Sequence, residues 1–296
     1  MRFNTLCAFF FFFLCFPVLV FALPQEAQQQ INDFSLIGYG EKGKKSWDIA
    51  GKTADIFDEV VKLKNVSGNL YGKEEDVNLT AKSGDFNRVN GRVYLKDDVV
   101  ITTSKGAKLT TDSMDWDRKN QVVATEDKVN INKDNVAIVG TGAQGVPSLN
   151  KVTLKKDVRV DINPDTAKKP AAELDFKDKV VITCDGRLVV DYEKNVASFY
   201  DNVIVERPDL VIYSDKLDLY FLVADGKLKS AKSTKSMASS IDRIVASGNV
   251  RIVRGENVSY SQEAVYNARD KKIILSGKPK LTFYSGEEFK DASFGN

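Results

Sequence analysis

The sequence contains no histidine, and this absence excludes several kinds of chemistry. Histidine is the usual general base of enzymes and the commonest metal ligand in proteins. Without it the chain has no Ser-His-Asp or Cys-His arrangement and no Cys/His cluster for zinc. We therefore expect a non-enzymatic protein, with no catalytic residue, no metal and no cofactor.

Cysteine is also scarce, with 3 residues in a chain of 296. Cys7 and Cys15 lie inside an apolar N-terminal run, which leaves Cys184 alone in the rest of the chain. A single cysteine cannot form an internal disulfide. We interpret Cys184 as a small buried residue; the alternative is a reactive thiol, for which no activating histidine is present.

The chain lacks a strong excess of either charge. Its formal net charge is +2, and its acidic and basic residues are interspersed. A nucleic-acid partner is therefore not expected, because proteins that bind nucleic acids concentrate basic residues. The glycine-rich phosphate loop that ends in Gly-Lys-Ser/Thr is missing too, so this kind of nucleotide site is excluded.

Long apolar runs are lacking except at the N-terminus, where residues 6–23 are apolar without interruption. Arg2 precedes this run, Pro17 lies within it, and residues 20–22 resemble a small-x-small cleavage site. Residues 1–22 are therefore a signal peptide or a retained membrane-anchor helix, and the sequence leaves this choice open. Both interpretations predict an exported protein, with a polar linker at 23–33.

From about residue 34 onward, short apolar runs alternate with polar residues, which is typical of β-strands. Asn-Gly and Asp-Gly pairs predict tight hairpin turns at 89–92, 184–187 and 224–227. The one candidate helix lies at about 52–63. These patterns predict an all-β protein.

An internal repeat is the most informative feature that is present. Each copy has a small or acidic residue, then a valine, then an alternating apolar pair. A hairpin of this kind cannot bury its apolar face alone, so the repeat predicts stacked antiparallel strands with alternate residues inward. The copies are LKDDVVI at 95–101, EDKVNI at 126–131, LKKDVRV at 154–160, YDNVIV at 200–205, SGNVRI at 247–252 and a weaker SGKPKLTF at 276–283.

Alternation also predicts the face on which each residue lies. In the last third we assign Ile252, Val258 and Tyr260 to the inner face, and Arg251, Ser259 and Ser261 to the outer face.

The composition changes at 163–178, which carries two of the seven prolines and no alternation. We predict a linker there, between an N-terminal unit at 34–162 and a C-terminal unit at 179–290. Residues 291–296 are assigned to a tail.

At this point the residues resemble known families. The segments FSLIGYGEKGKKSWDIAGKTADIF at 34–57 and AKLTTDSMDWDRKNQVVATEDKVNI at 107–131 resemble the periplasmic part of the lipopolysaccharide-export protein LptC. Residues 186–221 and 244–283, which include SGNVRI, resemble the OstA/LptA periplasmic bridge domain. In the familiar arrangement these modules are separate proteins, whereas here one chain carries both.

The resemblance implies two consecutive open β-jellyroll modules in the periplasm, tethered to the inner membrane by residues 6–23 if that run is retained. It also implies lipopolysaccharide as ligand, other jellyroll modules as head-to-tail partners, and an inner-membrane ABC transporter complex as the source of energy. The lipid A acyl chains would enter an apolar groove. The candidate groove residues are Ile101, Ile131, Val160, Val190, Val203, Val205, Leu219, Phe221, Val250, Ile252, Tyr260, Tyr266 and Phe283.

Two other functions stay open on sequence grounds. Inward apolar residues also fill an ordinary β-sandwich core, which would suit a structural or adhesive cell-envelope protein. A carbohydrate-active enzyme would need two carboxylates that face one cleft, and no pair stands out by its spacing. Asp112, Asp115 and Asp117 lie close together, but we interpret them as a solvated strand face.

Overall fold

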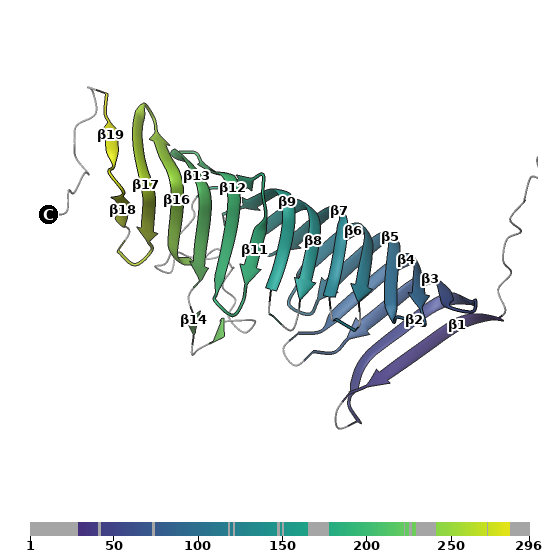
Figure 1. The fold of residues 1–296 in the computed structure, drawn as a ribbon. Coiled ribbons are helices and arrows are strands. Elements are labelled where there is room, and N and C mark those ends of the chain that lie inside the picture. The colour runs from purple at the N-terminus through teal and green to yellow at the C-terminus, as the bar shows by residue number, and fades with distance from the viewer. Residues whose placement is uncertain are drawn as a thin grey trace, which may run out of the picture.

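The computed structural model describes residues 29–284 except 41–42, 73–74, 118, 121, 147–148, 150, 165–177, 222, 225–226, 229–240 and 271. The described residues form β-strands and no α-helix, which confirms the predicted all-β fold (Figure 1). In chain order the strands are β1 (Gln29–Tyr39), β2 (Lys45–Ile56), β3 (Val60–Leu70), β4 (Val77–Asn87), β5 (Arg92–Thr103), β6 (Lys108–Asp117), β7 (Val122–Lys133), β8 (Val136–Val146), β9 (Lys151–Ile162), β10 (Val180–Cys184), β11 (Leu188–Asp191), β12 (Val196–Arg207), β13 (Leu210–Phe221), β14 (Val223–Ala224), β15 (Lys227–Leu228), β16 (Ile241–Arg254), β17 (Asn257–Asn267), β18 (Lys272–Ser276) and β19 (Lys280–Thr282).

Neighbours in sequence are also neighbours in the sheet. Strands β1 to β9 pair antiparallel in chain order, as do β12, β13, β16 and β17. All but β14 and β15 belong to one 17-stranded sheet, and those two form a separate hairpin. This meander is the arrangement expected of stacked hairpins and of OstA-like jellyroll modules.

The long strands bend near their middle, and the repeat marks the bends. Asp97 and Asp98, Asp201 and Asn202, and Gly248 with Asn249 have positive φ angles between 47° and 76°. Asp, Asn and Gly adopt this left-handed conformation more readily than other residues. The pairing register shifts by one residue at each of these bends, as in a β-bulge.

Side chains at the bends also bond across neighbouring strands. Ser83 donates from Oγ to Asp97 Oδ2 at 2.9 Å, and Ser113 donates to Asp127 Oδ2 at 2.6 Å. In the C-terminal part, Asn249 Nδ2 donates to a carboxylate oxygen of Asp215 at 2.9 Å. These bonds align the bends of successive strands.

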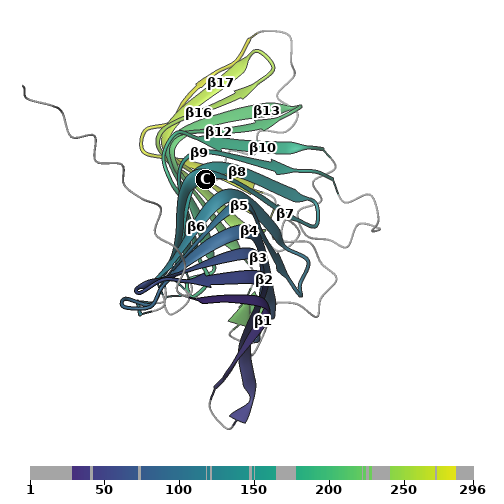
Figure 2. The same ribbon diagram turned by 90° about the vertical axis from the view of Figure 1, so that its right-hand side faces the viewer.

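The aligned bends divide the sheet into two walls. Each bend divides a long strand into two arms, one in each wall. The first wall includes residues 196–200 of β12 and 241–247 of β16, and the second wall includes residues 203–207 of β12 and 250–254 of β16. Figure 2 shows the bent strands stacked along the molecule, so that the sheet is folded along its length. The two walls share their inner faces, because buried residues of both belong to common core clusters.

The valine of each repeat copy occupies the innermost position of this folded sheet. Val99 and Val129 are 0% exposed, Val203 and Val250 1%, and Val158 2%. Each follows its bend directly and points between the walls. In the weaker copy, Pro279 takes the place of this valine between β18 and β19, where Gly277 and Lys278 have positive φ angles.

The predicted helix at 52–63 is wrong. Residues 45–56 form β2 and residues 60–70 form β3, joined by a short turn. The two strands pair from Ile56 with Val61 to Trp47 with Leu70. Long-range pairing on both sides of β2 outweighs the weak helical pattern of this segment.

The predicted hairpin at 184–187 is also wrong. Strands β10 and β11 do not pair with each other; both pair with β9 on one side and with β12 on the other. Cys184 lies opposite Val158 and Leu188 lies opposite Leu154, so the register with β9 continues across the interruption. The Asp185-Gly186 pair is therefore the bend of one long strand.

This interrupted strand joins the two predicted units. Strand β9 ends the N-terminal unit, and its partners β10 and β11 in turn pair with β12. The two halves consequently share one continuous sheet. Residues 165–177 of the predicted linker lie outside the described residues.

At the N-terminus, β1 begins at Gln29, within the segment assigned to the polar linker at 23–33. Its residues 29–32 pair with 53–56 of β2, so backbone pairing extends the strand beyond the apolar alternation. The apolar run at 6–23 and the tail at 291–296 lie outside the described residues. Among the residues that are described, no helix is long and apolar enough to cross a membrane.

Candidate functional site

The inner face of the folded sheet is apolar, and its burial depends on distance from the bends. The valines next to the bends are fully buried, as shown above. Ile101, Ile131 and Ile252 lie two residues further along their strands, and each is only half-buried. The two walls therefore pack tightly at the bends and leave apolar side chains partly accessible away from them.

Five of the predicted groove residues fill the core. Val203 and Val250 lie at bends, and Val160, Val205 and Leu219 lie two residues away from bends near the middle of the sheet. All five belong to one buried cluster of the C-terminal half. Their burial makes them structural residues in this conformation of the protein.

Six predicted residues are half-buried on the inner face. Ile131, Val190, Phe221 and Ile252 pack against the C-terminal cluster, and Ile101 packs against the N-terminal one. Tyr266 pairs with Ile244 at the inner face of the first wall. Burial raises the pKa of the Tyr266 phenol, which is consistent with this apolar position. These six are the predicted residues that an apolar ligand between the walls would reach.

The inward assignment of Tyr260 is wrong. Tyr260 pairs with Arg251, which pairs with Tyr213, and cross-strand partners share one face of a sheet. Ser259 and Ser261 instead lie opposite Ile252 and Val250 on the inner face, and Val258 moves to the outer face with Val253. The bend at 261–264 changes the alternation, because Ser261 and Ala264 are both buried.

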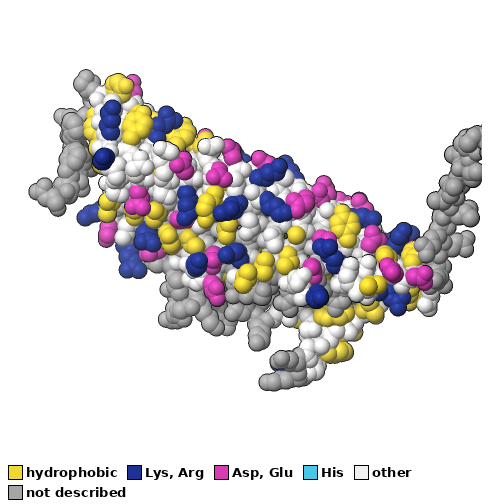
Figure 3. Space-filling view, in the orientation of Figure 1, with side chains coloured by type: hydrophobic (Ala, Val, Ile, Leu, Met, Phe, Trp, Pro, Cys, Tyr) yellow, Lys and Arg dark blue, Asp and Glu magenta, His cyan; other side chains and the backbone are white. Residues whose placement is uncertain are grey.

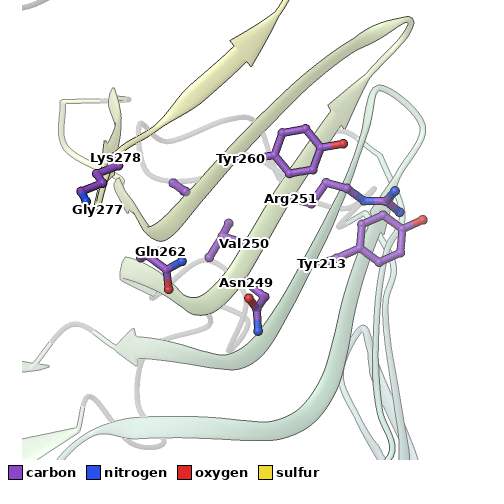
Figure 4. Close-up of a pocket in the computed structure, with 9 residues that line it drawn as sticks. Tyr213, Asn249, Val250, Arg251, Tyr260, Gln262, Gly277 and Lys278 are labelled. Atoms are coloured by element: carbon purple, nitrogen blue, oxygen red, sulfur yellow. The ribbon is translucent and has the colours of Figure 1, made fainter.

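Figure 4 shows Tyr260, Arg251 and Tyr213 side by side on this outer face. The Arg251 guanidinium lies over the Tyr213 ring, 4.1 Å from its centroid. The three line a shallow pocket of about 430 Å³ together with polar residues of the bends, among them Asn249, Gln262 and Lys278. Of the predicted groove residues, only Val250 and Tyr260 line this pocket, so it is not the apolar groove that the sequence predicts.

Phe283 follows the last strand and is 45% exposed. It belongs to a group of exposed apolar residues on the terminal strands of the sheet. At the other end, β1 carries a similar group. The exposed members are Ile31, Leu36, Ile37 and Tyr39 at the N-terminal end, and Ile273, Ile274, Leu281, Phe283 and Tyr284 at the C-terminal end.

The sequence prediction missed the inner-face residues of the intervening strands. Leu79, Leu109 and Trp116 are half-buried against the N-terminal cluster, and Ile138 and Ile212 against the C-terminal one. These strands lack the valine repeat but have their own bend pattern, in which two buried residues stand three positions apart, as in Thr111-x-x-Met114 and Ser214-x-x-Leu217. That spacing would have identified them.

The inner face is closed at the junction of the halves. Ile162 of β9 and Val180 and Ile182 of β10 are all buried. Val160 is buried as well, whereas Ile101 and Ile252, which also stand two residues after a repeat valine, are half-buried. The inner face is therefore covered more completely at the junction than toward the two ends.

The outer face carries charges of both signs rather than one continuous patch (Figure 3). Ion pairs between neighbouring strands, such as Lys96 with Asp85 and Arg92 with Asp115, account for part of this pattern. Such exposed pairs contribute little to stability. They keep the sheet soluble on the side that faces water.

Cys184 lies in the core at the bend between β10 and β11. Burial raises the pKa of its thiol to about 11. The thiolate that would react as a nucleophile is therefore a minor species at neutral pH. The interpretation of Cys184 as a buried structural residue fits this environment.

Comparison with known proteins finds two family matches, one in each half of the chain. Residues 20–163 match the family described as lipopolysaccharide-assembly, LptC-related. Residues 182–294 match the family described as LptA/(LptD N-terminal domain) LPS transport protein. No curated protein matches the sequence. A single polypeptide therefore carries one module that matches the LptC-related family and one that matches the LptA/LptD N-terminal family of lipopolysaccharide transport.

Proposed function

We propose that this protein is a non-enzymatic periplasmic component of the lipopolysaccharide export bridge, which shields lipid A acyl chains between the two walls of its folded sheet. The observation that carries the proposal is the row of half-buried apolar residues on the inner face, including Ile101, Ile131 and Ile252. A fully packed sandwich would bury these positions as completely as it buries Val99.

The energetics favour acyl chains as the ligand. Each methylene group that leaves water contributes about 0.8 kcal/mol, so even a few acyl segments bind firmly to such a surface. Release then needs an external source of energy, and the described residues offer no catalytic group for it. We assign this role to the inner-membrane ABC transporter complex of the export system.

The terminal strands support the proposed assembly with other bridge modules. Among the described residues, strands β1 and β18–β19 pair on one side only, and both ends carry exposed apolar residues. An open edge of this kind can accept a strand from another module. The junction of β9 with β10 and β11 is an example of such pairing inside this chain.

The proposal is tested by photocrosslinking in cells that export lipopolysaccharide. A photoreactive residue at Ile252 is expected to capture lipopolysaccharide, whereas the same residue at the adjacent outward position Arg251 is not. Ile252→Asp should reduce capture at Ile101 or Ile131 more than Arg251→Asp does, because it places a charge among apolar groups. Absence of capture at all inner positions would contradict the proposal and favour a packed structural protein.

A further inference from the structure

Two arginines lie on the otherwise apolar inner face of the second wall, at the ends of the arms that are farthest from the bends. On β12 the inward positions after the bend are Val203, Val205 and Arg207, and on β16 they are Val250, Ile252 and Arg254. The alternation follows from the pairs Arg207 with Leu210 and Arg254 with Asn257, which continue the inner rows of β13 and β17. Both arms therefore end in a cation on the side of the sheet that otherwise holds apolar residues.

One carboxylate lies between the two cations. Arg207 Nε is 3.0 Å from Asp209 Oδ1, and Arg254 Nη2 is 3.2 Å from Asp209 Oδ2. Asp209 lies in the turn between β12 and β13, next to both arginines. The cluster keeps one excess positive charge, because two guanidinium groups share a single carboxylate.

The cluster faces the opposite wall. The positive charge of Arg207 acts on the phenol of Tyr266, which lies on the inner side of the first wall, and opposes the rise in its pKa that burial causes. This influence agrees with the strand pairings, which place Arg207 and Tyr266 on the inner sides of opposite walls. Its side chain is 34% exposed, and that of Arg254 is 70% exposed.

Stability alone does not account for this arrangement. Ion pairs of such exposure contribute little to stability, and an arginine at an inward position gives up the apolar contact that a valine would make. In the N-terminal half the position four residues after the repeat valine is occupied by Thr103, Lys133 and Ile162, so its side chain varies from copy to copy. The fold therefore does not require arginine here.

We propose that Arg207 and Arg254 bind a phosphate group on the head of the glycolipid whose acyl chains contact Ile252 and its inner-face neighbours. This inference rests on the proposed function and adds a recognition site to it. Arginine presents a planar set of donors that matches phosphate oxygens, and two of them suit a group with more than one negative charge. Ile252 precedes Arg254 by two residues, or about 7 Å along a strand. An acyl chain on Ile252 therefore places its head group at the arginines.

The test measures binding of a lipid A-type glycolipid to the exported chain, with the phosphorylated and the dephosphorylated forms compared. The double variant Arg207→Gln/Arg254→Gln should bind the phosphorylated form at least 10-fold more weakly and the dephosphorylated form as before. Arg251→Gln is the matched control, because Arg251 lies on the same strand but on the outer face. Equal loss in this control, or equal affinity of the unmodified chain for the two lipids, overturns the inference.

A second variant separates phosphate binding from a merely structural role of the ion pairs. Asp209→Asn removes the competing carboxylate and leaves both cations, so it should strengthen binding of the phosphorylated lipid. If the arginines serve only to hold the turn, Asp209→Asn and the double arginine variant will lower the thermal midpoint alike and neither will discriminate between the lipids. That result overturns the inference even if the double variant folds poorly.

Inorganic phosphate alone distinguishes the source of the ligand. Weak or undetectable binding of phosphate without lipid is expected, since the acyl chains supply most of the affinity. Binding of phosphate as tight as that of the lipid would overturn the assignment to a lipid head group. Capture of both lipids at Ile252 without any effect of the arginines would refute this inference and leave the proposed function intact, whereas no capture of either lipid would refute the proposed function itself.

Discussion

The two halves of the sheet bend in the same way but differ in the side chains that complete each face. In both halves a fully buried valine follows the bend, as Val99 and Val250 show. Four residues after the repeat valine the N-terminal half has Thr103, Lys133 and Ile162, whereas the C-terminal half has Arg207 and Arg254. Both halves thus share the backbone bend, and the recognition of a ligand that we propose depends on individual side chains that differ between them.

The outer faces differ as well. In the N-terminal half Asp48 accepts hydrogen bonds from Asn69 at 2.8 Å and from Tyr71 at 2.7 Å, and it pairs with Lys45 at 2.7 Å. In the C-terminal half arginines instead lie over tyrosine rings, as Arg243 does over Tyr220 at 4.3 Å. The N-terminal cluster includes a cation–π contact too, since Lys45 lies over the Tyr71 ring at 5.2 Å, so the two examples differ in the use of lysine or arginine as the cation.

The largest expected effect comes from breaking the junction between the halves. Thr183→Pro removes a backbone N–H from β10, which pairs on both sides, and places a proline in a central strand. The lost hydrogen bond alone costs about 1–3 kcal/mol. We expect the single unfolding transition of the continuous sheet to separate into two.

Urea unfolding followed in parallel by tryptophan fluorescence and circular dichroism measures this separation. Both tryptophans, Trp47 and Trp116, lie in the N-terminal half, so fluorescence reports that half and dichroism reports both. Thr183→Val keeps the N–H and should leave the two curves coincident. Coincident curves in the proline variant would show that the halves do not depend on this junction.

An intermediate effect is expected from residues at the bends. Asn249→Val places a β-branched residue at a φ angle of 47°, which should destabilise the protein by about 1–3 kcal/mol. Asn249→Gly tolerates that angle and loses only the bond to Asp215, so it should cost less. Asp98→Val and Asp98→Gly repeat the comparison in the N-terminal half, where φ is 55°. Chemical denaturation measures all four, and equal losses for valine and glycine would argue against conformational control of the bends.

The smallest effect concerns the carboxylate cluster of the N-terminal half. Hydrogen bonding to Lys45, Asn69 and Tyr71 lowers the pKa of Asp48 from 3.8 to about 2. Because the folded-state pKa is lowered, the stabilisation is fully present above pH 3.8 and is lost as the pH falls toward 2. Asp48→Asn should lower the thermal midpoint slightly at neutral pH, and the difference from the unmodified chain should shrink in acid. A difference that is constant between pH 5 and pH 2 would contradict this assignment.

Local sequence features determined much of this protein. The absence of histidine excluded the common catalytic arrangements, alternation predicted the strands, and the valine repeat predicted that the strands stack antiparallel. The prediction of consecutive β-strands was confirmed, because alternation depends on residues within a few positions of one another. The family resemblance of both segments was visible at the same level.

Tertiary structure decided the rest. Strand β10 pairs with β9 across a segment that composition identifies only as a linker, because pairing partners are chosen by long-range contacts. The faces of Tyr260 and Ser261 depend on the register shift at the bend, where the two paired strands contribute unequal numbers of residues. Alternation within one strand does not reveal this shift. The effect of Arg207 on the pKa of Tyr266 arises only because strands that are distant in sequence contribute to facing walls of the folded sheet.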